Sequence, residues 1–259
     1  MLLRSCIISF LLWAFLPSYL VHSKVESTAM TAAKKEEKLA AYMRMVYDQL
    51  EVLNDKPDFL VFQKALSGFL QLSHADQIEN KLLTIIDFSL PSTQERLWII
   101  DMTSQAIIYQ SYVAHGQQSG GLYAEHFSNK PNSHQSSLGF YITGEPYQGK
   151  HGLSLRLDGL EAGINDKARE RAIVIHSADY VSQTFIEQHG RLGRSHGCPA
   201  IPKEAHEKII QQIAGKSCLY IYHDSPAYHA QSQVQLSSQV LNAMIIELIP
   251  TTDLPNQLN

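Results

Sequence analysis

One cysteine lies in a turn-like segment whose neighbours could present its thiol to a substrate. Cys198 follows Gly197 and precedes Pro199, in a run that begins at Arg194. A thiol attacks as its thiolate, which requires a nearby base or positive charge. Gly197 would let the backbone approach a substrate carbonyl closely, and Arg194 and Arg191 supply positive charge. The pattern favours Cys198 as a catalytic nucleophile.

A histidine upstream could serve as the base for this thiol. His176 follows the apolar run 172–175, and the polar residue Ser177 follows it. A histidine at the end of a strand can take a proton from a group on a neighbouring loop. Two other interpretations stay open: a buried cysteine is often only a small apolar residue, and His176, His196 and Cys198 could bind zinc. The paired ligands at short spacing that typify zinc sites are missing, and the other histidines, such as His115, are expected at the surface.

Short apolar runs separated by turn residues must form the scaffold for these side chains. They predict strands over 83–88, 96–101, 106–113, 139–143, 153–157, 172–175 and 218–222, with helices over 180–189 and 203–213. Strands at this spacing favour a mainly β fold with peripheral helices, either a β-sandwich or a small barrel.

The N-terminal part of the chain has a different texture. Arg4 precedes the apolar run 7–16, which is too short to span a bilayer comfortably, and residues 21–23 offer a cleavage site. We expect a signal peptide cleaved near Ser23, in preference to an uncleaved anchor, and hence an exported protein of the periplasm or cell envelope. The expected organisation is a signal peptide over 1–23, a helical segment over 24–80, a catalytic domain over 81–223 and a tail over 224–259.

Helical periodicity defines the segment that precedes the strands. The patterns over 38–53 and 58–72 predict a helical hairpin, preceded by a polar linker or frayed start over 24–37. The tail contains one apolar stretch, 240–249, which we expect to form a peripheral helix or strand.

Composition and cysteine content narrow the possibilities further. Apolar residues make up 44% of the 259 residues, which is enough for a core, and the net charge of -4 argues against a nucleic acid partner. Without the signal peptide, Cys198 and Cys218 remain, and an exported protein could join them in a disulfide. Cys218 lies in an apolar run typical of a buried strand, and a disulfide would consume the proposed nucleophile.

From about Asp87 to Tyr222 the sequence resembles the murein L,D-transpeptidase catalytic domain. The pattern Gly-Arg-Leu-Gly-Arg-Ser-x-Gly-Cys-Pro-Ala stands at 190–200, and further matching stretches are 87–89, 113–116, 127–131, 136–139, 147–152 and 155–160. The resemblance places the nucleophile at Cys198, the catalytic histidine at His176, and at Ser177 the residue whose carbonyl orients the imidazole. His196 matches a second motif histidine of open role, and the amides of Gly197 and Cys198 would lie near the oxyanion.

The chain departs from the best-known members just after the cysteine. Those members have an aliphatic residue followed by Arg or Asn, where this sequence has Pro199 and Ala200. Arg191 and Arg194 are therefore the candidates for binding a substrate carboxylate, and His151 is a further candidate in the matching pattern.

The resemblance implies acyl transfer on peptidoglycan stem peptides. The thiolate would attack the carbonyl between an L-centre and a terminal D-amino acid, and an amine would accept the acyl group. Neither a cofactor nor a metal is implied, carbapenem-type β-lactams would acylate the same thiol, and contact with a membrane would be peripheral at most. Two alternatives remain: an L,D-carboxypeptidase or endopeptidase that uses water as the acceptor, and a wall-binding module that has lost catalysis.

Overall fold

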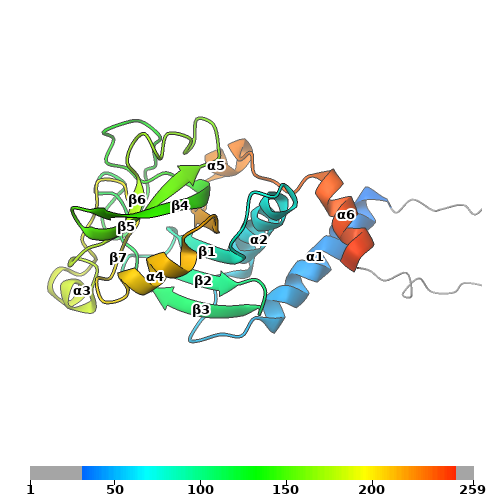
Figure 1. The fold of residues 1–259 in the computed structure, drawn as a ribbon, viewed down its shortest axis with the longest axis horizontal. Coiled ribbons are helices and arrows are strands. Elements are labelled where there is room, and N and C mark those ends of the chain that lie inside the picture. The colour runs from blue at the N-terminus through cyan, green and yellow to red at the C-terminus, as the bar shows by residue number, and fades with distance from the viewer. Residues whose placement is uncertain (1–30, 249–259) are drawn as a thin grey trace, which may run out of the picture. The chain divides into compact units, whose positions relative to one another are not determined.

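The computed structural model describes residues 31–248, so the predicted signal peptide lies outside the described residues. The strands are β1 (Leu82–Asp87), β2 (Leu97–Asp101), β3 (Ala106–Ser111), β4 (Gly139–Gly149), β5 (Gly152–Gly159), β6 (Val174–Ser177), β7 (Ala200–Ile201) and β8 (Cys218–Tyr222). The helices are α1 (Ala32–Gln49), α2 (Phe59–His74), α3 (Gln183–His189), α4 (His206–Ile213), α5 (Pro226–Gln231) and α6 (Ser238–Leu248), as Figure 1 shows.

One mixed sheet organises the fold. Its eight strands follow the order β3-β2-β1-β8-β4-β5-β6-β7, and the sheet is curved into a nearly closed, barrel-like form. The pairs β1–β8 and β6–β7 are parallel, and the other neighbouring strands are antiparallel. The predicted mainly β fold with peripheral helices and an N-terminal helical hairpin is confirmed.

The central strands are mostly apolar because both of their faces are covered. Every residue of β8 is buried, as is nearly all of β1, and such strands have continuous apolar runs in place of alternation. Helix α2 packs on both strands, as Figure 1 shows for β1, and its buried face belongs to the same core as theirs. The side chain of Asp58 caps this helix by accepting a hydrogen bond from the Leu60 N–H at 2.8 Å.

The first helix differs from its predicted span at both ends. It begins at Ala32, so residues 32–37 are helical; their alanine, lysine and glutamate residues are strong helix formers. It ends at Gln49, before the predicted end at residue 53, because Glu51 pairs with the start of β3. The Glu51 N–H donates to the Gln105 carbonyl at 3.0 Å, and the Glu51 carbonyl accepts from the Ile107 N–H at 2.8 Å.

Helix α3 and strand β6 also differ from prediction, and both differences affect the site. Helix α3 starts at Gln183, not at Tyr180, because Ser182 is its N-cap and accepts from the Phe185 N–H at 3.2 Å. Strand β6 begins two residues later than predicted because Ala172 has a left-handed φ of +53°. His176 therefore lies within the strand and not after it.

The C-terminal segment forms two helices. Helix α6 packs on α1, so the predicted peripheral element is a helix, whereas α5 was not predicted. The buried carboxylate of Glu161 accepts from the Phe140 N–H of β4 and from Tyr228 Oη of α5. It also accepts from Ser232 Oγ and the Gln233 N–H, so it ties α5 and the residues after it to the sheet. Between residues 31 and 248, none of the helices combines the length and apolar character needed to cross a bilayer.

Candidate active site

Parallel pairing of two short strands brings the predicted nucleophile and base together. Strands β6 and β7 align His176 with Ala200 and Ser177 with Ile201. Cys198 precedes Ala200 by two residues, so its turn enters β7 directly alongside β6. Cys198 and His176 both line one cavity of about 510 Å³.

The turn that carries Cys198 is held from both sides by serine hydroxyls. Ser195 Oγ accepts from the Gly197 N–H at 3.0 Å and donates to the Cys198 carbonyl at 2.6 Å. Ser136 Oγ accepts from the Gly116 N–H at 3.0 Å and donates to the Gly197 carbonyl at 3.1 Å. These four bonds fix the turn against the loop that contains Gly116.

Glycine is required at position 197 for two reasons. Its φ of +122° lies in a region that side chains disfavour, and an added Cβ would lie 2.8 Å from the Gln135 carbonyl oxygen. Its N–H is already bound to Ser195 Oγ, so it is not a free donor for the expected oxyanion.

Burial and the neighbouring polar and charged groups have opposite effects on the pKa of the Cys198 thiol, which is partly exposed. Desolvation raises the pKa of the thiol, while the Val174 N–H and the charges of Arg171 and Lys150 partly offset that rise. The thiol donates to the Ala172 carbonyl across 3.6 Å. The resting group at neutral pH is therefore a thiol, which needs a base to ionise.

The geometry of His176 suits it to be that base. Its Nδ1 lies 2.9 Å from the Ser177 carbonyl, which can only accept, so Nδ1 carries the proton and Nε2 is left as an acceptor. Only 6% of the residue is exposed, and this burial, followed by the neighbouring His151 and Lys150, lowers the pKa of the imidazole. His176 is therefore neutral at neutral pH.

The remaining predicted residues divide between the cavity and its surroundings. His151 lines the cavity and stacks on His176 with ring centroids 4.7 Å apart, and its carbonyl accepts from Ser177 Oγ at 3.1 Å. His196 is exposed at the cavity and stacks on His134, with centroids 4.4 Å apart. In the described residues, no group of three or more His, Cys, Asp or Glu side chains is arranged to hold a metal ion.

The two predicted carboxylate-binding arginines differ in position. Arg194 lines the cavity, and its Nη1 donates to the Gly120 carbonyl at 2.8 Å and the Gln117 carbonyl at 3.3 Å. Arg191 does not line the cavity, and its Nη1 donates to the Leu192 carbonyl at 2.7 Å.

Two further side chains of the cavity were missed in the sequence. The sequence predicts Tyr180 as the first residue of a helix, but it lies before α3 and lines the cavity. Burial and then Cys198 raise the pKa of Tyr180 to about 12. Arg171 was not among the predicted site residues, yet it is half-buried and lines the same cavity. The only signal in the sequence was an arginine directly before the predicted strand over 172–175.

The expectation that His115 lies at the surface was wrong. The residue is fully buried, and its Nδ1 lies 2.9 Å from Nη2 of the equally buried Arg96. Burial, followed by Arg96, lowers the pKa of His115 to about 3, so it accepts this bond as a neutral ring. The His115 carbonyl accepts from the Ser195 N–H at 3.0 Å and so supports the nucleophile turn.

The fold and the cavity define a mixed-sheet protein with a thiol and a neutral imidazole lining one cleft. The family model of the L,D-transpeptidase catalytic domain matches residues 53–222, which is more than half of the chain. The chain therefore belongs to the L,D-transpeptidase catalytic domain family, a family that acts on peptidoglycan.

Solved proteins that match this chain do so at low sequence identity. An L,D-transpeptidase from Mycobacterium smegmatis is 10% identical with a TM-score of 0.34, and the match covers 55% of this chain and 59% of that one. LD transpeptidase LdtMt1 in complex with imipenem is 11% identical with a TM-score of 0.34, at the same coverages of 55% and 59%. Bd1075 from Bdellovibrio bacteriovorus is 16% identical with a TM-score of 0.36, at coverages of 65% and 56%. The chain thus spans under two thirds of the length of these proteins, and no curated protein matches it.

Proposed function

We propose that this protein is a peptidoglycan L,D-transpeptidase that uses Cys198 as nucleophile and His176 as its base. One observation carries the proposal: a thiol and a neutral imidazole with a free Nε2, held by two paired strands, line the same cavity. Family membership supports the proposed substrate class, the stem peptides of peptidoglycan.

The proposed reaction has two halves. Cys198 Sγ attacks the carbonyl between the L-centre and the terminal D-amino acid, and its proton passes to His176 Nε2. The C–N bond then breaks, the imidazolium returns the proton to the leaving amine, and a thioester remains. An amine from a second stem attacks the thioester, which forms a new amide and restores the thiol.

The hydroxyl of Tyr180 is a suitable donor for the oxyanion. It faces the cavity and stays protonated at neutral pH because its pKa is raised to about 12. It would act together with the Cys198 N–H, since the Gly197 N–H is taken up by Ser195 Oγ.

Muropeptide analysis tests the function. Purified protein incubated with disaccharide-tetrapeptide should yield cross-linked dimers, and a Cys198→Ala variant should yield none. Shortened monomers without dimers would instead identify the hydrolase, in which water is the acceptor. No change in the muropeptides would favour the wall-binding module.

The proposed substrate also requires export. Arg4, the apolar run 7–16 and the cleavage site near Ser23 favour a mature protein that begins near Lys24, outside the cytoplasm. The intact mass of the exported protein tests this proposal, and a mass that retains Met1 would contradict cleavage.

Arg194→Ala should weaken the use of the donor peptide by about 1–3 kcal/mol in kcat/KM, the size of a charged hydrogen bond. Both bonds of Arg194 in the described structure come from Nη1, and the guanidinium borders the cavity, so it can also bind a substrate carboxylate. Arg191→Ala is the matched control and should retain kcat/KM, because Arg191 lies outside the cavity lining. Wild-type kinetics in both variants would mean that another group binds the carboxylate.

Gly197→Ala should lower kcat by about 100-fold or more, because its Cβ would push the nucleophile turn away from the Gln135 carbonyl. Gly163→Ala is the control: it imposes a side chain at a φ of +77°, but no atom lies within 4 Å of the new Cβ. Both variants should lose about 1–3 kcal/mol of stability from backbone strain, measured by urea unfolding. Equal turnover by the two variants would contradict the need for close approach at Gly197.

A further inference from the structure

Arg171 stands at the end of a tight turn that faces the nucleophile. The Ile173 N–H donates to the Ala168 carbonyl at 2.9 Å, and the Ala172 N–H donates to the Arg169 carbonyl at 3.1 Å. This pair of bonds, with Ala172 in a left-handed conformation, is a Schellman motif. The motif directs the Ala172 carbonyl to Cys198 Sγ and places the side chain of Arg171 in the lining of the same cavity.

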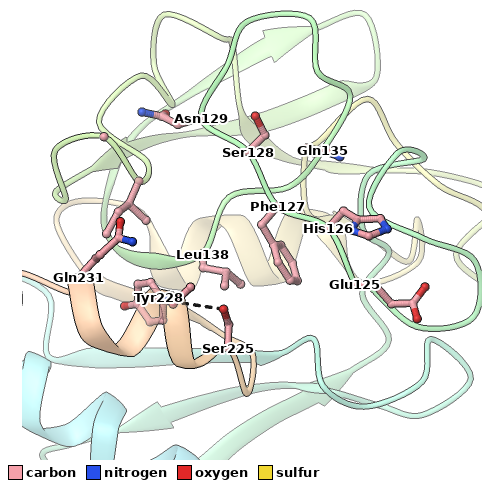
Figure 2. A pocket seen from close by; sticks show the side chains of 13 residues that line it. Glu125, His126, Phe127, Ser128, Asn129, Gln135, Leu138, Ser225, Tyr228 and Gln231 are labelled. Carbon is pink, nitrogen blue, oxygen red and sulfur yellow. Dashed lines mark hydrogen bonds between the residues drawn. The ribbon is translucent and has the colours of Figure 1, made fainter.

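The guanidinium of Arg171 is held by neutral groups of a single loop. Nη1 donates to the Ser128 carbonyl at 2.7 Å and to Ser137 Oγ at 2.5 Å. Nη2 donates to the Gln135 carbonyl at 2.7 Å and to Ser133 Oγ at 3.2 Å. Figure 2 shows Ser128 and Gln135 on this loop, which also borders a second cavity of about 450 Å³. Four donors of the fork are therefore occupied.

These bonds fix the position of the charge without neutralising it. The ion pairs of the described residues involve other cations and do not include Arg171; those cations are Arg156, Arg169, Lys203 and Lys216. Carbonyl and hydroxyl oxygens compensate a cation only in part, so a half-buried positive charge remains at the cavity. With four donors occupied, Arg171 cannot grip a substrate carboxylate with a free bidentate fork.

The loop that Arg171 binds also touches the nucleophile turn. The Gln135 carbonyl that accepts from Arg171 is the atom that a Cβ on Gly197 would meet at 2.8 Å. The Gln135 carbonyl thus lies between the guanidinium of Arg171 and the turn that carries Cys198. Arg171 therefore has a fixed position relative to the thiol.

We propose that Arg171 is the fixed cation that stabilises the Cys198 thiolate when His176 removes its proton. The inference rests on the proposed function, in which the thiol proton moves to His176 Nε2 and leaves a negative charge on Sγ. The negative charge of the thiolate and the positive charge of the imidazolium cancel, and Arg171 supplies an additional positive field at the sulfur. Burial raises the pKa of the Cys198 thiol, and the charge of Arg171 is one of the groups that offset this rise. Burial lowers the pKa of Arg171, and Tyr141 and then the sulfur offset part of that change.

Other charged and titratable groups face the same cavity. They are Lys150, Arg194, His151, His176, His196, Tyr147 and Tyr180. Lys150 also lowers the pKa of the thiol, but it is exposed on the turn between β4 and β5, where solvent and salt screen its charge. Arg171 is distinguished by its four fixed hydrogen bonds and its partial burial.

The experiment measures the pH dependence of Cys198 alkylation by iodoacetamide, read by peptide mass spectrometry so that only the Cys198 peptide is counted. In Arg171→Gln, whose amide can still donate to a loop carbonyl, the midpoint should rise by about one pH unit. Arg171→Lys keeps the charge and should recover at least half of that shift. Arg171→Met is a second neutral variant for the same comparison if the Gln variant does not fold.

Ser133→Ala is the matched control, because it removes one of the bonds of Arg171 without changing any charge. Its midpoint should equal that of the wild type, whereas a rise equal to that of Arg171→Gln would overturn the inference and assign the effect to the loop. An unchanged midpoint in the neutral variants would also overturn it. Alkylation needs no substrate, so that result would stand even if muropeptide dimers support the proposed function. A raised midpoint would support the inference even if no dimers form.

Discussion

Cys198→Ser is expected to lower acyl transfer to stem peptides on the order of 10⁴-fold or more, because removal of a nucleophile eliminates the covalent route. The serine hydroxyl fits the same turn, but a neutral imidazole of lowered pKa is a poor base for a group far less acidic than a thiol. The measurement is the initial rate of dimer formation from tetrapeptide donors. Melting temperature should change little, because the position is partly exposed and the substitution is nearly isosteric.

The control for this variant is the other described cysteine. Cys218 is fully buried in β8, and its burial raises its thiol pKa, so Cys218→Ala should lose stability but keep its turnover per folded molecule. Incubation with a carbapenem should add one covalent adduct to the Cys198 peptide and none to the Cys218 peptide. An adduct confined to Cys218, or full activity in Cys198→Ser, would refute the nucleophile assignment.

The sheet could be predicted from the sequence where its strands are buried on both faces. β1 and β8 appear as runs of mostly apolar and β-branched or aromatic residues, and a pattern of that kind has few alternatives over five or six residues. The short strand β7 could not be found, because its two residues form a strand only through pairing with distant parts of the chain, namely β6 and Ala114. The pairing of β6 with β7 also decides which residues lie near Cys198. Local sequence pattern could therefore not predict the register of these two strands.

The site shows the same division between local and long-range information. Cys198 and Gly197 could be identified from the sequence alone. A glycine beside a possible nucleophile indicates that the backbone there needs a conformation or a close approach that other residues disfavour. Arg171 was missed because every bond of its guanidinium goes to a carbonyl or hydroxyl, and such partners leave no charge pattern in the sequence. Arg191 and Arg194 looked equivalent in the sequence, and only the fold places Arg194 at the cavity.

His176→Ala is expected to lower kcat at neutral pH by about 10²–10⁴-fold, the usual cost of losing a general base. The fold should survive, because the side chain makes one hydrogen bond, to the adjacent carbonyl of Ser177. His196→Ala is the matched control: it removes a second imidazole from the same cavity, but an exposed one stacked on His134, and should cost less than about 10-fold. An equal loss in both variants would remove the reason to single out His176.

The pH profile separates the role of His176 as a base from any structural role. Its imidazole accepts a proton only when neutral, and burial lowers its pKa below the ordinary 6.5. The wild-type kcat/KM should therefore rise with pH through a midpoint below 6.5 and stay level at neutral pH. His176→Ala should lack this rise. It should instead gain activity only near the pKa of the Cys198 thiol, which is raised above its ordinary 9.0, because hydroxide from solvent can then remove the thiol proton in place of the imidazole. His196→Ala should keep the wild-type rise. A His176→Ala profile that retains the midpoint below 6.5 would show that another group takes the proton.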